Sequence, residues 1–438
     1  MKKWIAAGVI LLVASSIALW KFRPSPKPAQ TKPHKVFLIG LDGASWNLMQ
    51  GLLQSGKLPN FQRLIESGTS GNLKSFVPTK SPILWTTIAT GKVPSKHGIG
   101  NFTAEVNGKT VPVSGTQRLT KAFWNILSDY NVRVGVVNWW VTWPPEKVNG
   151  FMVSDRYRSS ANNEKAVITY PENLVKDLPK IPISMDRYLE ERRKFGLPEN
   201  LKPDANSKVI DQLATDYKGY WAQDRAVRES CRRLLTKQNV DVFAVIFRII
   251  DVSSHLFWTY LDPNLIAEMR TKSETGNLSA KDIQRIDAEF TKFIGPIYEY
   301  SDRILGEFLH RADSDTHFIV LSDHGFKFEE GRYGHSAMNE PPPGIIILSG
   351  PSFRKNHMIQ NATLLDIAPT LLYLQNIPVA RDMDGKILAN AFTKEFMKQT
   401  QVRVITSHDT GMKKKGQARE SEMDEEILED LKTLGYIN

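Results

Sequence analysis

The chain has 438 residues, of which 41% are hydrophobic and 24% charged, so its bulk is typical of a folded globular protein and not of a disordered or fibrous one. Its formal net charge is +10, but residues 1–35 carry seven basic and no acidic residues, which leaves +3 (10 − 7) on residues 36–438. Because this body is nearly neutral, binding of a nucleic-acid duplex is not expected. The single cysteine, Cys231, excludes an intrachain disulfide framework and a cysteine-rich metal cluster.

The N-terminus predicts a membrane segment. Two lysines precede an apolar run over residues 4–20, and 17 residues in a helix span roughly 26 Å, close to the ~30 Å hydrocarbon core of a bilayer. We interpret residues 1–23 as an uncleaved single-pass anchor or a signal segment, and the proline-rich residues 24–35 as an extended linker. The rest of the chain is then expected outside the cytoplasm, either anchored to the membrane or, after cleavage, secreted or periplasmic.

Short apolar runs alternate with helical periodicity through the body. The runs that predict strands buried on both faces are residues 36–41, 132–139, 242–250, 318–321 and 345–348. The segments with helical spacing are residues 59–67, 121–129, 223–235, 300–310 and 364–374. This alternation predicts an α/β fold, a doubly wound and mostly parallel sheet with helices on both faces.

Residues 156–222 interrupt this alternation, because they are rich in charge, proline and tyrosine and contain no strong apolar strand. We predict an inserted cap there, between the two parts of a catalytic domain at residues 36–155 and 223–400, and we expect it to determine substrate specificity. Residues 262–298 predict a helical excursion over the sheet. Residues 401–438 form a charged tail with a short amphipathic helix.

Three of the predicted strands lead into an aspartate, and histidines follow nearby. The aspartates are Asp42, Asp251 and Asp323, and the histidines are His255, His324 and His335. The carboxyl ends of the strands of an open α/β sheet form its binding edge, and three carboxylates there repel one another unless cations are bound. One such aspartate alone would be interpreted as a helix or turn cap. The whole set favours a metal site.

Residues 79–91 predict a helix, with Ser81 as the N-cap, Pro82 at the first helical position and Gly91 just past the end. Ser81 has two interpretations. It is either only a cap, or a nucleophile whose alkoxide is favoured by the helix N-terminus and by a metal ion. The local sequence does not decide between them.

Together these motifs resemble the alkaline phosphatase superfamily, most closely its type I phosphodiesterase/nucleotide pyrophosphatase branch, from about residue 36 to residue 388. The motifs that carry the resemblance are the strand into Asp42, the Ser81–Gly91 helix with His97-Gly98, Asp251-x3-His255, Ser322-Asp323-His324-Gly325, His335, Asp366–Thr370 and Asp384-Gly385. The resemblance implies an alkaline phosphatase-like fold and two metal positions. One would be held by Asp251, His255 and His335, and the other by Asp42, Asp323, His324 and the Ser81 hydroxyl.

The resemblance also implies the remaining roles. The nucleophile of this branch, commonly threonine, lies nine residues before the final Thr-Gly of the helix, which gives Ser81, with Thr79 as the second candidate. Asn101 is the candidate for an amide that contacts the phosphoryl oxygens, and His97 is expected to be structural. Since Ser81 departs from the common threonine, the preference between monoesters and diesters stays open. The residues after Ser81 lack the Cys- or Ser-x-Pro-Ser-Arg signature of the sulfatase branch.

The sequence therefore predicts a metal-dependent hydrolase of small phosphodiesters or nucleotide pyrophosphates that forms a seryl-phosphoryl intermediate. Mixed aspartate and histidine ligands suit two Zn²⁺ ions, with Mn²⁺ as the alternative. Two enzymatic alternatives use the same site: a phosphomonoesterase, and a transferase that passes the phospho-group to an acceptor at the membrane. An alternative of another class is a membrane-tethered binding module whose metals are structural.

Overall fold

The computed structural model describes residues 32–157, 167–181, 184–194, 207–329, 332–335, 340–411 and 416–437. The chain divides into two units, Met1–Pro33 and His34–Asn438, and the fold below is that of the second unit. The predicted membrane segment at residues 1–23 lies outside the described residues. Within the part of the chain that the structure describes, none of the helices combines the length and apolar character needed to cross a bilayer.

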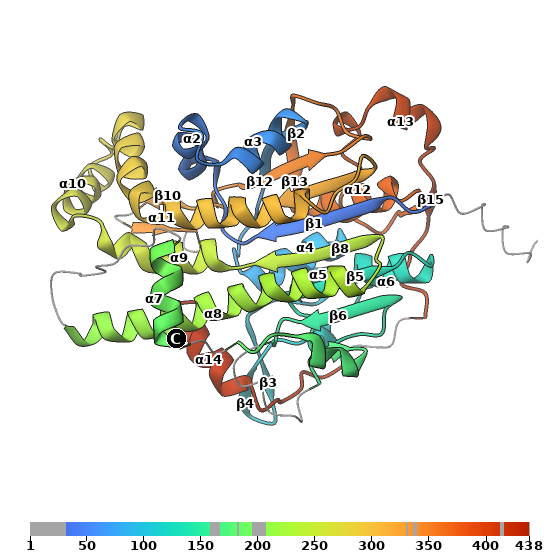
Figure 1. Cartoon of the computed structure of the whole chain (residues 1–438), viewed down its shortest axis with the longest axis horizontal. Coiled ribbons are helices and arrows are strands. Elements are labelled where there is room, and N and C mark those ends of the chain that lie inside the picture. Colours follow the sequence, from blue (N-terminus) through green and yellow to red (C-terminus); the bar gives the residue numbers. More distant parts are fainter. Residues whose placement is uncertain are drawn as a thin grey trace, which may run out of the picture. The chain divides into compact units, whose positions relative to one another are not determined.

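A nine-stranded sheet organises the second unit (Figure 1). Its strands, in spatial order, are β13 (His357–Thr363), β2 (Gly68–Lys74), β12 (Gly344–Ser349), β9 (Thr316–Leu321), β1 (Lys35–Leu41), β8 (Val242–Phe247), β5 (Val134–Trp139), β6 (Gly150–Ser154) and β7 (Thr169–Tyr170). Strand β1 pairs in parallel with both β8 and β9, and β5 and β6 extend this parallel block. Strand β12 is antiparallel to β9 and β2, and β7 is antiparallel to β6. The predicted α/β, mostly parallel sheet is confirmed.

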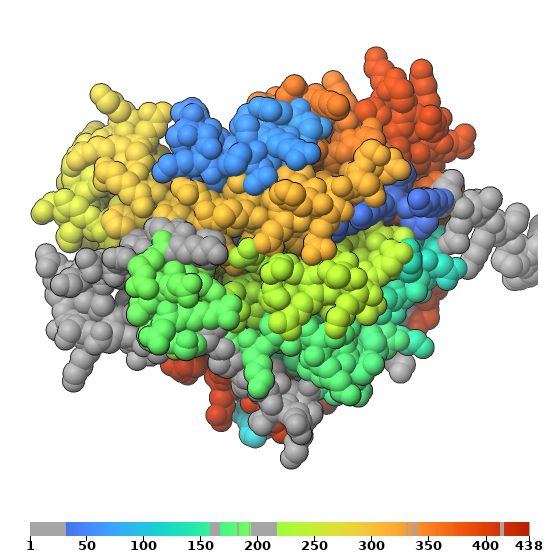
Figure 2. All heavy atoms as spheres, viewed as in Figure 1, coloured from blue at the N-terminus to red at the C-terminus, as the bar shows by residue number. Residues whose placement is uncertain are grey.

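Helices cover both faces of the sheet because successive residues of a strand point to opposite faces. In β1, Phe37 and Ile39 join one apolar cluster, whereas Val36 and Leu38 join the other. The first face carries α2 (Trp46–Gln54), α3 (Pro59–Glu66), α8 (Ser207–Lys237), α9 (Ile249–Phe257), α11 (Ala280–Leu309) and α14 (Asp424–Thr433), several of which lie side by side in Figure 2. The second face carries α4 (Ser81–Thr90), α6 (Phe123–Asp129) and α12 (Ile367–Leu374).

Smaller elements complete the unit. They are the hairpin β3 (Thr103–Val106) and β4 (Lys109–Pro112), the hairpin β10 (Lys327–Glu329) and β11 (Arg332–Gly334), the pair β14 (Val379–Ala380) and β15 (Val404–Ile405), and the helices α5 (Pro94–His97), α7 (Met185–Lys194), α10 (Pro263–Glu274) and α13 (Lys394–Gln399). The helix predicted in the C-terminal tail is present as α14. The predicted boundary between residues 222 and 223 lies inside α8, which continues onto the sheet.

Several predicted elements were wrong in extent or were missed. The apolar run over residues 242–250 is not one strand, because β8 ends at Phe247 and α9 begins at Ile249. An unbroken run of apolar residues occurs both in buried strands and in buried helical turns, so the sequence pattern does not distinguish the two. Strands β2 and β13 were missed because their sequences, GTSGNLK and HMIQNAT, are largely polar and lie toward one edge of the sheet. The helix predicted at residues 300–310 is the last part of the longer α11.

Candidate active site

The predicted ligand residues gather at the carboxyl ends of three adjacent parallel strands. Asp42 follows β1, and Asp323 and His324 follow β9. Asp251 lies in the first turn of α9, which follows β8, and His335 follows β11. All five side chains are buried. The topological rule that places a site at this edge therefore holds for residues nearly 300 positions apart, Asp42 and His335 (335 − 42 = 293).

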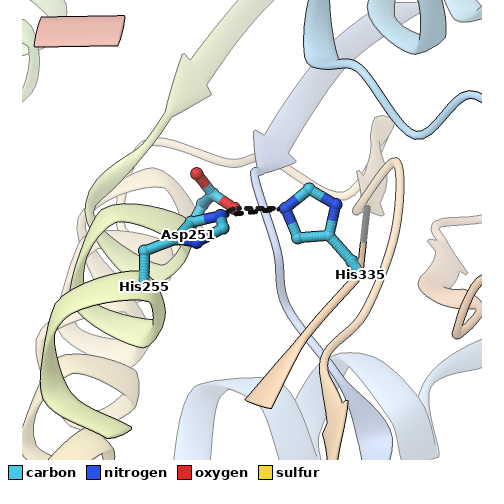
Figure 3. A group of neighbouring side chains, drawn as sticks. All are labelled: Asp251, His255 and His335. Carbon is cyan, nitrogen blue, oxygen red and sulfur yellow. Dashed lines mark hydrogen bonds and ion pairs between the residues drawn. The ribbon is translucent and has the colours of Figure 1, made fainter. Parts of the chain in front are cut away.

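Asp251, His255 and His335 form one group of potential metal ligands (Figure 3). Asp251 and His255 are one helical turn apart on α9, so both side chains lie on the same side of the helix. The Asp251 Oδ1 atom lies 3.5 Å from His255 Nε2 and 3.6 Å from His335 Nε2. The two imidazoles approach each other to 2.9 Å between their Nε2 atoms.

Asp42, Asp251 and His324 form a second group, so Asp251 contributes to both. His324 Nε2 lies 3.4 Å from Asp42 Oδ1 and 3.7 Å from Asp251 Oδ1. Asp323, which the resemblance assigned to this position, lies beside the group, with Oδ2 3.7 Å from His324 Nε2. His324 Nδ1 lies 3.2 Å from the Gly325 carbonyl oxygen, an arrangement that leaves Nε2 for a ligand.

Burial and the neighbouring charges shift the pKa values of these groups. Burial would lower the pKa of His324, but the carboxylates of Asp323, Asp42 and Asp251 outweigh it and raise that pKa to about 10. Burial and the neighbouring Asp42 carboxylate raise the pKa of Asp323 well above its ordinary value. For Asp251, burial raises the pKa, but His255, His324 and His335 together hold it below the ordinary range. Burial and the charges of His324 and His255 lower the pKa of His335.

Buried polar atoms without a hydrogen-bond partner gather in these two groups. They are Asp42 Oδ1, Asp251 Oδ1, both carboxylate oxygens of Asp323, His324 Nε2 and His335 Nδ1. A buried polar atom without a partner is costly, and carboxylate oxygens with imidazole nitrogens are the donor set that divalent metal ions prefer. The residues present therefore fit divalent metal ions.

Ser81 is the first residue of α4, and Lys80 is its N-cap. The predicted N-cap role of Ser81 was wrong by one residue, because Ser81 already has helical geometry and makes no capping bond. Its Oγ atom is buried and has no hydrogen-bond partner. By contrast, the Thr79 hydroxyl donates to the His335 carbonyl oxygen at 2.6 Å.

Trp85 orients the Ser81 face of α4 toward Asp42. Residues Ser81 and Trp85 are one helical turn apart, and Trp85 Nε1 donates to Asp42 Oδ2 at 3.2 Å. The close approach requires Gly40 in β1, because a Cβ atom there would lie 2.5 Å from the Trp85 ring. Ser81 is thus bracketed by Thr79, which contacts His335, and by Trp85, which contacts Asp42.

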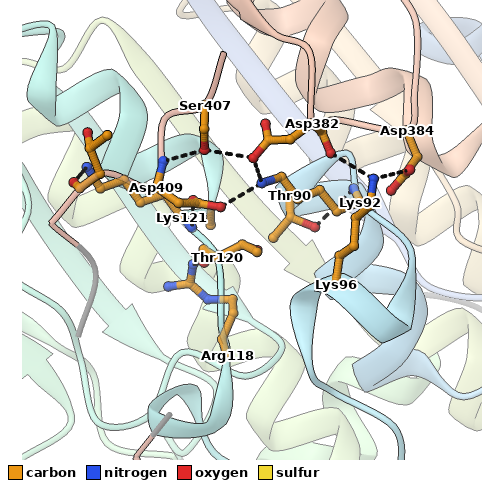
Figure 4. A network of polar contacts seen from close by, with 12 residues as sticks. Thr90, Lys92, Lys96, Arg118, Thr120, Lys121, Asp382, Asp384, Ser407 and Asp409 are labelled. Atoms are coloured by element: carbon orange, nitrogen blue, oxygen red, sulfur yellow. Dashed lines mark hydrogen bonds and ion pairs between the residues drawn. The ribbon is translucent and has the colours of Figure 1, made fainter. Parts of the chain in front are cut away.

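A polar network holds the other end of α4 (Figure 4). Buried Lys92 pairs through Nζ with Asp382 Oδ2 at 2.7 Å and Asp409 Oδ2 at 2.6 Å. The Gly91 carbonyl oxygen accepts the N–H of Asp384 at 2.8 Å. Asp366 Oδ1 accepts the N–H of Lys386 at 2.8 Å. The motif Asp384-Gly385, which the sequence indicated without a role, therefore anchors the end of the helix that carries Ser81, and Asp366 fixes the residue that follows this motif.

Asn101 and His97 make contacts outside the two ligand groups. Asn101 is exposed, and its Oδ1 accepts from Lys80 Nζ at 2.8 Å, so it lies beside the N-cap of α4. His97 is fully buried, with Nε2 3.0 Å from the Thr87 hydroxyl and Nδ1 accepting from the Ile99 N–H. These contacts agree with the structural role expected for His97.

Three aromatic residues at the site were missed from the sequence. Trp85 and Trp140 both donate from Nε1 to Asp42 Oδ2 at 3.2 Å, which leaves Oδ1 for a ligand. The Tyr436 hydroxyl donates to Asp251 Oδ2. Nothing in the local sequence marks these residues, because an aromatic side chain in an apolar run is interpreted as core.

Comparison with known proteins gives short sequence matches to curated sulfatases. Human arylsulfatase K is 28% identical over 141 residues, which are 30% of this chain and 26% of that protein. Arylsulfatase K of Gallus gallus is 30% identical over 123 residues, 26% of this chain and 22% of that protein. The chain thus spans about a quarter of the length of these relatives.

Two solved structures illustrate the structural similarity. A putative sulfatase from Bacteroides thetaiotaomicron has a TM-score of 0.50 and 12% identity, and the match covers 82% of this chain and 74% of that one. Human ectonucleotide pyrophosphatase/phosphodiesterase 5 has a TM-score of 0.45 and 13% identity, with coverage of 80% and 97%. At these identities the sulfatase structure shows a shared fold alone, and the predicted alkaline phosphatase-like fold is confirmed.

The family model for type I phosphodiesterase/nucleotide pyrophosphatase matches residues 36–342. This range contains every predicted ligand residue and both nucleophile candidates. It also begins at β1, the central strand that leads into Asp42. The chain therefore belongs to the type I phosphodiesterase/nucleotide pyrophosphatase family.

Proposed function

We propose that the protein hydrolyses small phosphodiesters or nucleotide-type pyrophosphates at a site with two divalent metal ions, through a covalent intermediate on Ser81. One observation carries the proposal. Buried carboxylate and imidazole atoms without partners gather at one edge of the sheet, next to the helix whose first hydroxyl, that of Ser81, is also buried and unpartnered.

The proposed roles follow from the contacts. Asp251, His255 and His335 would hold one ion. Asp42 and His324, together with Asp323 and the Ser81 hydroxyl, would hold the second. Bound metal ions would neutralise the charge of the phosphoryl oxygens and lower the pKa of the Ser81 hydroxyl and of water. Zn²⁺ suits this donor set best, and Mn²⁺ is the alternative.

The protein's own groups prepare the nucleophile. Ser81 is the first residue of α4, so it lies at the positive end of the helix dipole, which favours the alkoxide and the anionic phosphoryl group. Ser81 loses its hydroxyl proton and attacks phosphorus in line, while the bond from phosphorus to the leaving oxygen breaks and that oxygen takes up a proton. Water then attacks phosphorus, the P–Oγ bond breaks, and a proton from the water returns to Oγ. Asn101 and Lys80 lie at the same helix end, where a phosphoryl oxygen could be contacted.

A substrate panel tests this function. The rates with p-nitrophenyl phosphate, bis-p-nitrophenyl phosphate and a nucleotide p-nitrophenyl ester are measured with added zinc or manganese. We expect the diester or the nucleotide ester to be hydrolysed fastest. A preference for the monoester would favour the phosphomonoesterase alternative, and release that speeds up with an added alcohol acceptor would favour the transferase. Absence of turnover with all substrates and both metals would contradict the proposal and favour the binding module.

We also propose that residues 1–23 anchor the protein in a membrane and place the enzyme outside the cytoplasm. The support is the apolar run and the basic and proline-rich residues that follow it. Protease added to cells with a permeabilised outer envelope should release a soluble fragment. A chain that stays intact in the cytoplasm would show that this orientation is wrong.

A further inference from the structure

The C-terminal residues 416–437, here named the closing segment, are fastened to the catalytic body. The Arg156 guanidinium donates from Nη1 to Asp424 Oδ1 at 2.8 Å and from Nη2 to the Pro112 carbonyl oxygen at 3.1 Å. It also lies 3.9 Å from the centroid of the Trp143 ring. Arg156 is 2% exposed and Asp424 9%, so separating the pair would leave a buried charge without its partner. The segment is therefore part of the folded unit.

The end of α14 directs Tyr436 toward the metal-ligand groups. The helix buries Ile427 and Leu431 against the same apolar cluster as α9. Gly435 then takes the left-handed conformation, with φ of 74°, and its N–H donates to the Lys432 carbonyl oxygen at 2.9 Å. The Tyr436 N–H donates to the Leu431 carbonyl oxygen at 2.8 Å. This pair of bonds is a Schellman motif, which turns the chain back over the helix end.

Tyr436 lies directly on the candidate active site. Its ring stacks on Phe102 with centroids 4.7 Å apart and meets the His255 ring edge-on at 5.1 Å. Its hydroxyl donates to Oδ2 of Asp251, the residue that both ligand groups share. The Tyr436 ring thus covers His255, and the Tyr436 hydroxyl holds the Asp251 carboxylate in place.

The closing segment forms one wall of a cavity at the site. The cavity lies between the carboxylates of Asp42 and Asp251 on one side and Leu431, Leu434 and Tyr436 on the other. Removing the Tyr436 ring would therefore enlarge the space next to Asp251.

We propose that the closing segment covers this side of the metal centre and that Tyr436 determines specificity by limiting the size of the substrate group that fits there. This inference rests on the proposed function. Tyr436 acts in two ways: its ring occupies space beside His255, and its hydroxyl holds the segment to Asp251. Specificity then depends on the C-terminal segment and not only on the predicted cap at residues 156–222.

Variants at Tyr436 test the inference in the full-length protein loaded with zinc. Tyr436→Ala should raise the ratio of kcat/KM for bis-p-nitrophenyl phosphate to that for p-nitrophenyl phosphate by about tenfold, because the second aryl group gains room. Tyr436→Phe keeps the ring and should change this ratio little. Tyr373→Phe is the matched control, since the Tyr373 hydroxyl also makes one bond, to the Thr400 carbonyl oxygen at 2.8 Å, away from the site.

A second readout does not need turnover. The rate at which excess chelator removes zinc should be several-fold faster for Tyr436→Ala than for wild type, and unchanged for Tyr373→Phe. If wild type turns over but Tyr436→Ala changes neither the substrate ratio nor zinc release, the closing segment does not cover the site and the inference is wrong. If wild type hydrolyses neither ester yet zinc release accelerates in Tyr436→Ala, the closure stands and the proposed function fails.

Discussion

The proposed chemistry depends on the hydroxyl group of Ser81. This hydroxyl is buried at the start of α4 and unpartnered, whereas the neighbouring Thr79 hydroxyl is already committed to the His335 carbonyl oxygen. A hydroxyl that donates to a backbone carbonyl is held away from phosphorus by that bond. The contacts therefore favour Ser81 over Thr79, although both lie within the same short segment.

Ser81→Ala should lower turnover by at least about a thousandfold, because the covalent route disappears while the metal ligands remain. Stability should change little, since Ser81 makes no capping bond. Ser81→Thr should retain part of the activity. Turnover is measured as the steady-state rate with the substrate of the panel that wild type hydrolyses fastest. The control Thr79→Ala should be mild. Loss of turnover in Thr79→Ala with retention in Ser81→Ala would move the nucleophile to Thr79.

Asp224, which is not one of the proposed metal ligands, gives a pH-dependent prediction. Burial raises the pKa of Asp224 to about 7, although it accepts the Arg248 N–H at 3.1 Å and lies near the Arg228 charge. The folded state then keeps a proton that the unfolded chain loses near pH 4. Because the folded state binds more protons between these values, the free energy of unfolding falls as the pH rises, by at most about 1.4 kcal/mol per pH unit.

Asp224→Asn should remove this slope, because an amide does not titrate and its oxygen can still accept the Arg248 N–H. This dependence of the unfolding free energy on pH is measured by urea unfolding of wild type and variant at pH 5, 6, 7 and 8, at a fixed zinc concentration. We expect the variant to gain stability relative to wild type as the pH rises. A constant difference across this range would show that Asp224 does not titrate there.

At the scale of elements, the helix α4 is held at both ends by tertiary contacts. Its amphipathic character is weak because all ten of its residues are buried, so its place depends on its neighbours. Trp85 ties its first turns to Asp42, and Gly91 and Lys92 tie its end to residues 382–384. A displacement at either end would move Ser81 relative to the ligand groups.

Lys92→Met should lower the free energy of unfolding by about 3 kcal/mol, because it leaves two carboxylates without their buried cation. Only 4% of the Lys92 side chain is exposed. Lys96→Met is the matched control, because Lys96 pairs with Asp384 at 2.5 Å but has 44% of its side chain exposed. An exposed pair contributes about 1 kcal/mol or less. Chemical denaturation measures the free energy of unfolding of both variants. Equal losses in the two variants would show that the buried Lys92 pairs stabilise the protein no more than the exposed Lys96 pair.

At the scale of the whole molecule, the two apolar clusters and the candidate metal-ligand groups occupy different parts of the fold. The clusters extend over both faces of the sheet and include residues from nearly every described helix. The ligand groups occupy only the carboxyl edge. The fold should therefore not depend on metal in the way that a small metal-stabilised domain does.

Chelation should remove activity and leave the protein folded. We expect elemental analysis of active protein to find about two divalent ions per chain. After chelator treatment, far-UV circular dichroism should be retained, thermal unfolding should shift downward, and zinc should restore turnover. Active protein without metal would contradict the site assignment. Unfolding of the whole body on chelation would show that the metals are structural, as the binding-module alternative requires.

Much of the site could be predicted from the sequence because its signals are local. Asp42 follows the apolar run of β1 directly and Asp323 follows that of β9 after one serine, and Asp251 with His255 has the spacing of one helical turn. The extent of β8 and the cap of α4 were predicted less well. In both cases the deciding contacts come from other elements, which a run of apolar residues does not reveal.

The sequence by itself determined the fold class and the family, and it predicted a set of ligand types, because these follow from hydrophobic periodicity and from motifs in chain order. Only the tertiary structure decided how these parts meet. It places Asp251 in both ligand groups, sets Trp85 and Trp140 on Asp42, and brings Tyr436 to Asp251 across 185 positions of the chain. The physical reason is that such contacts depend on packing between distant elements, and no local period or spacing encodes them.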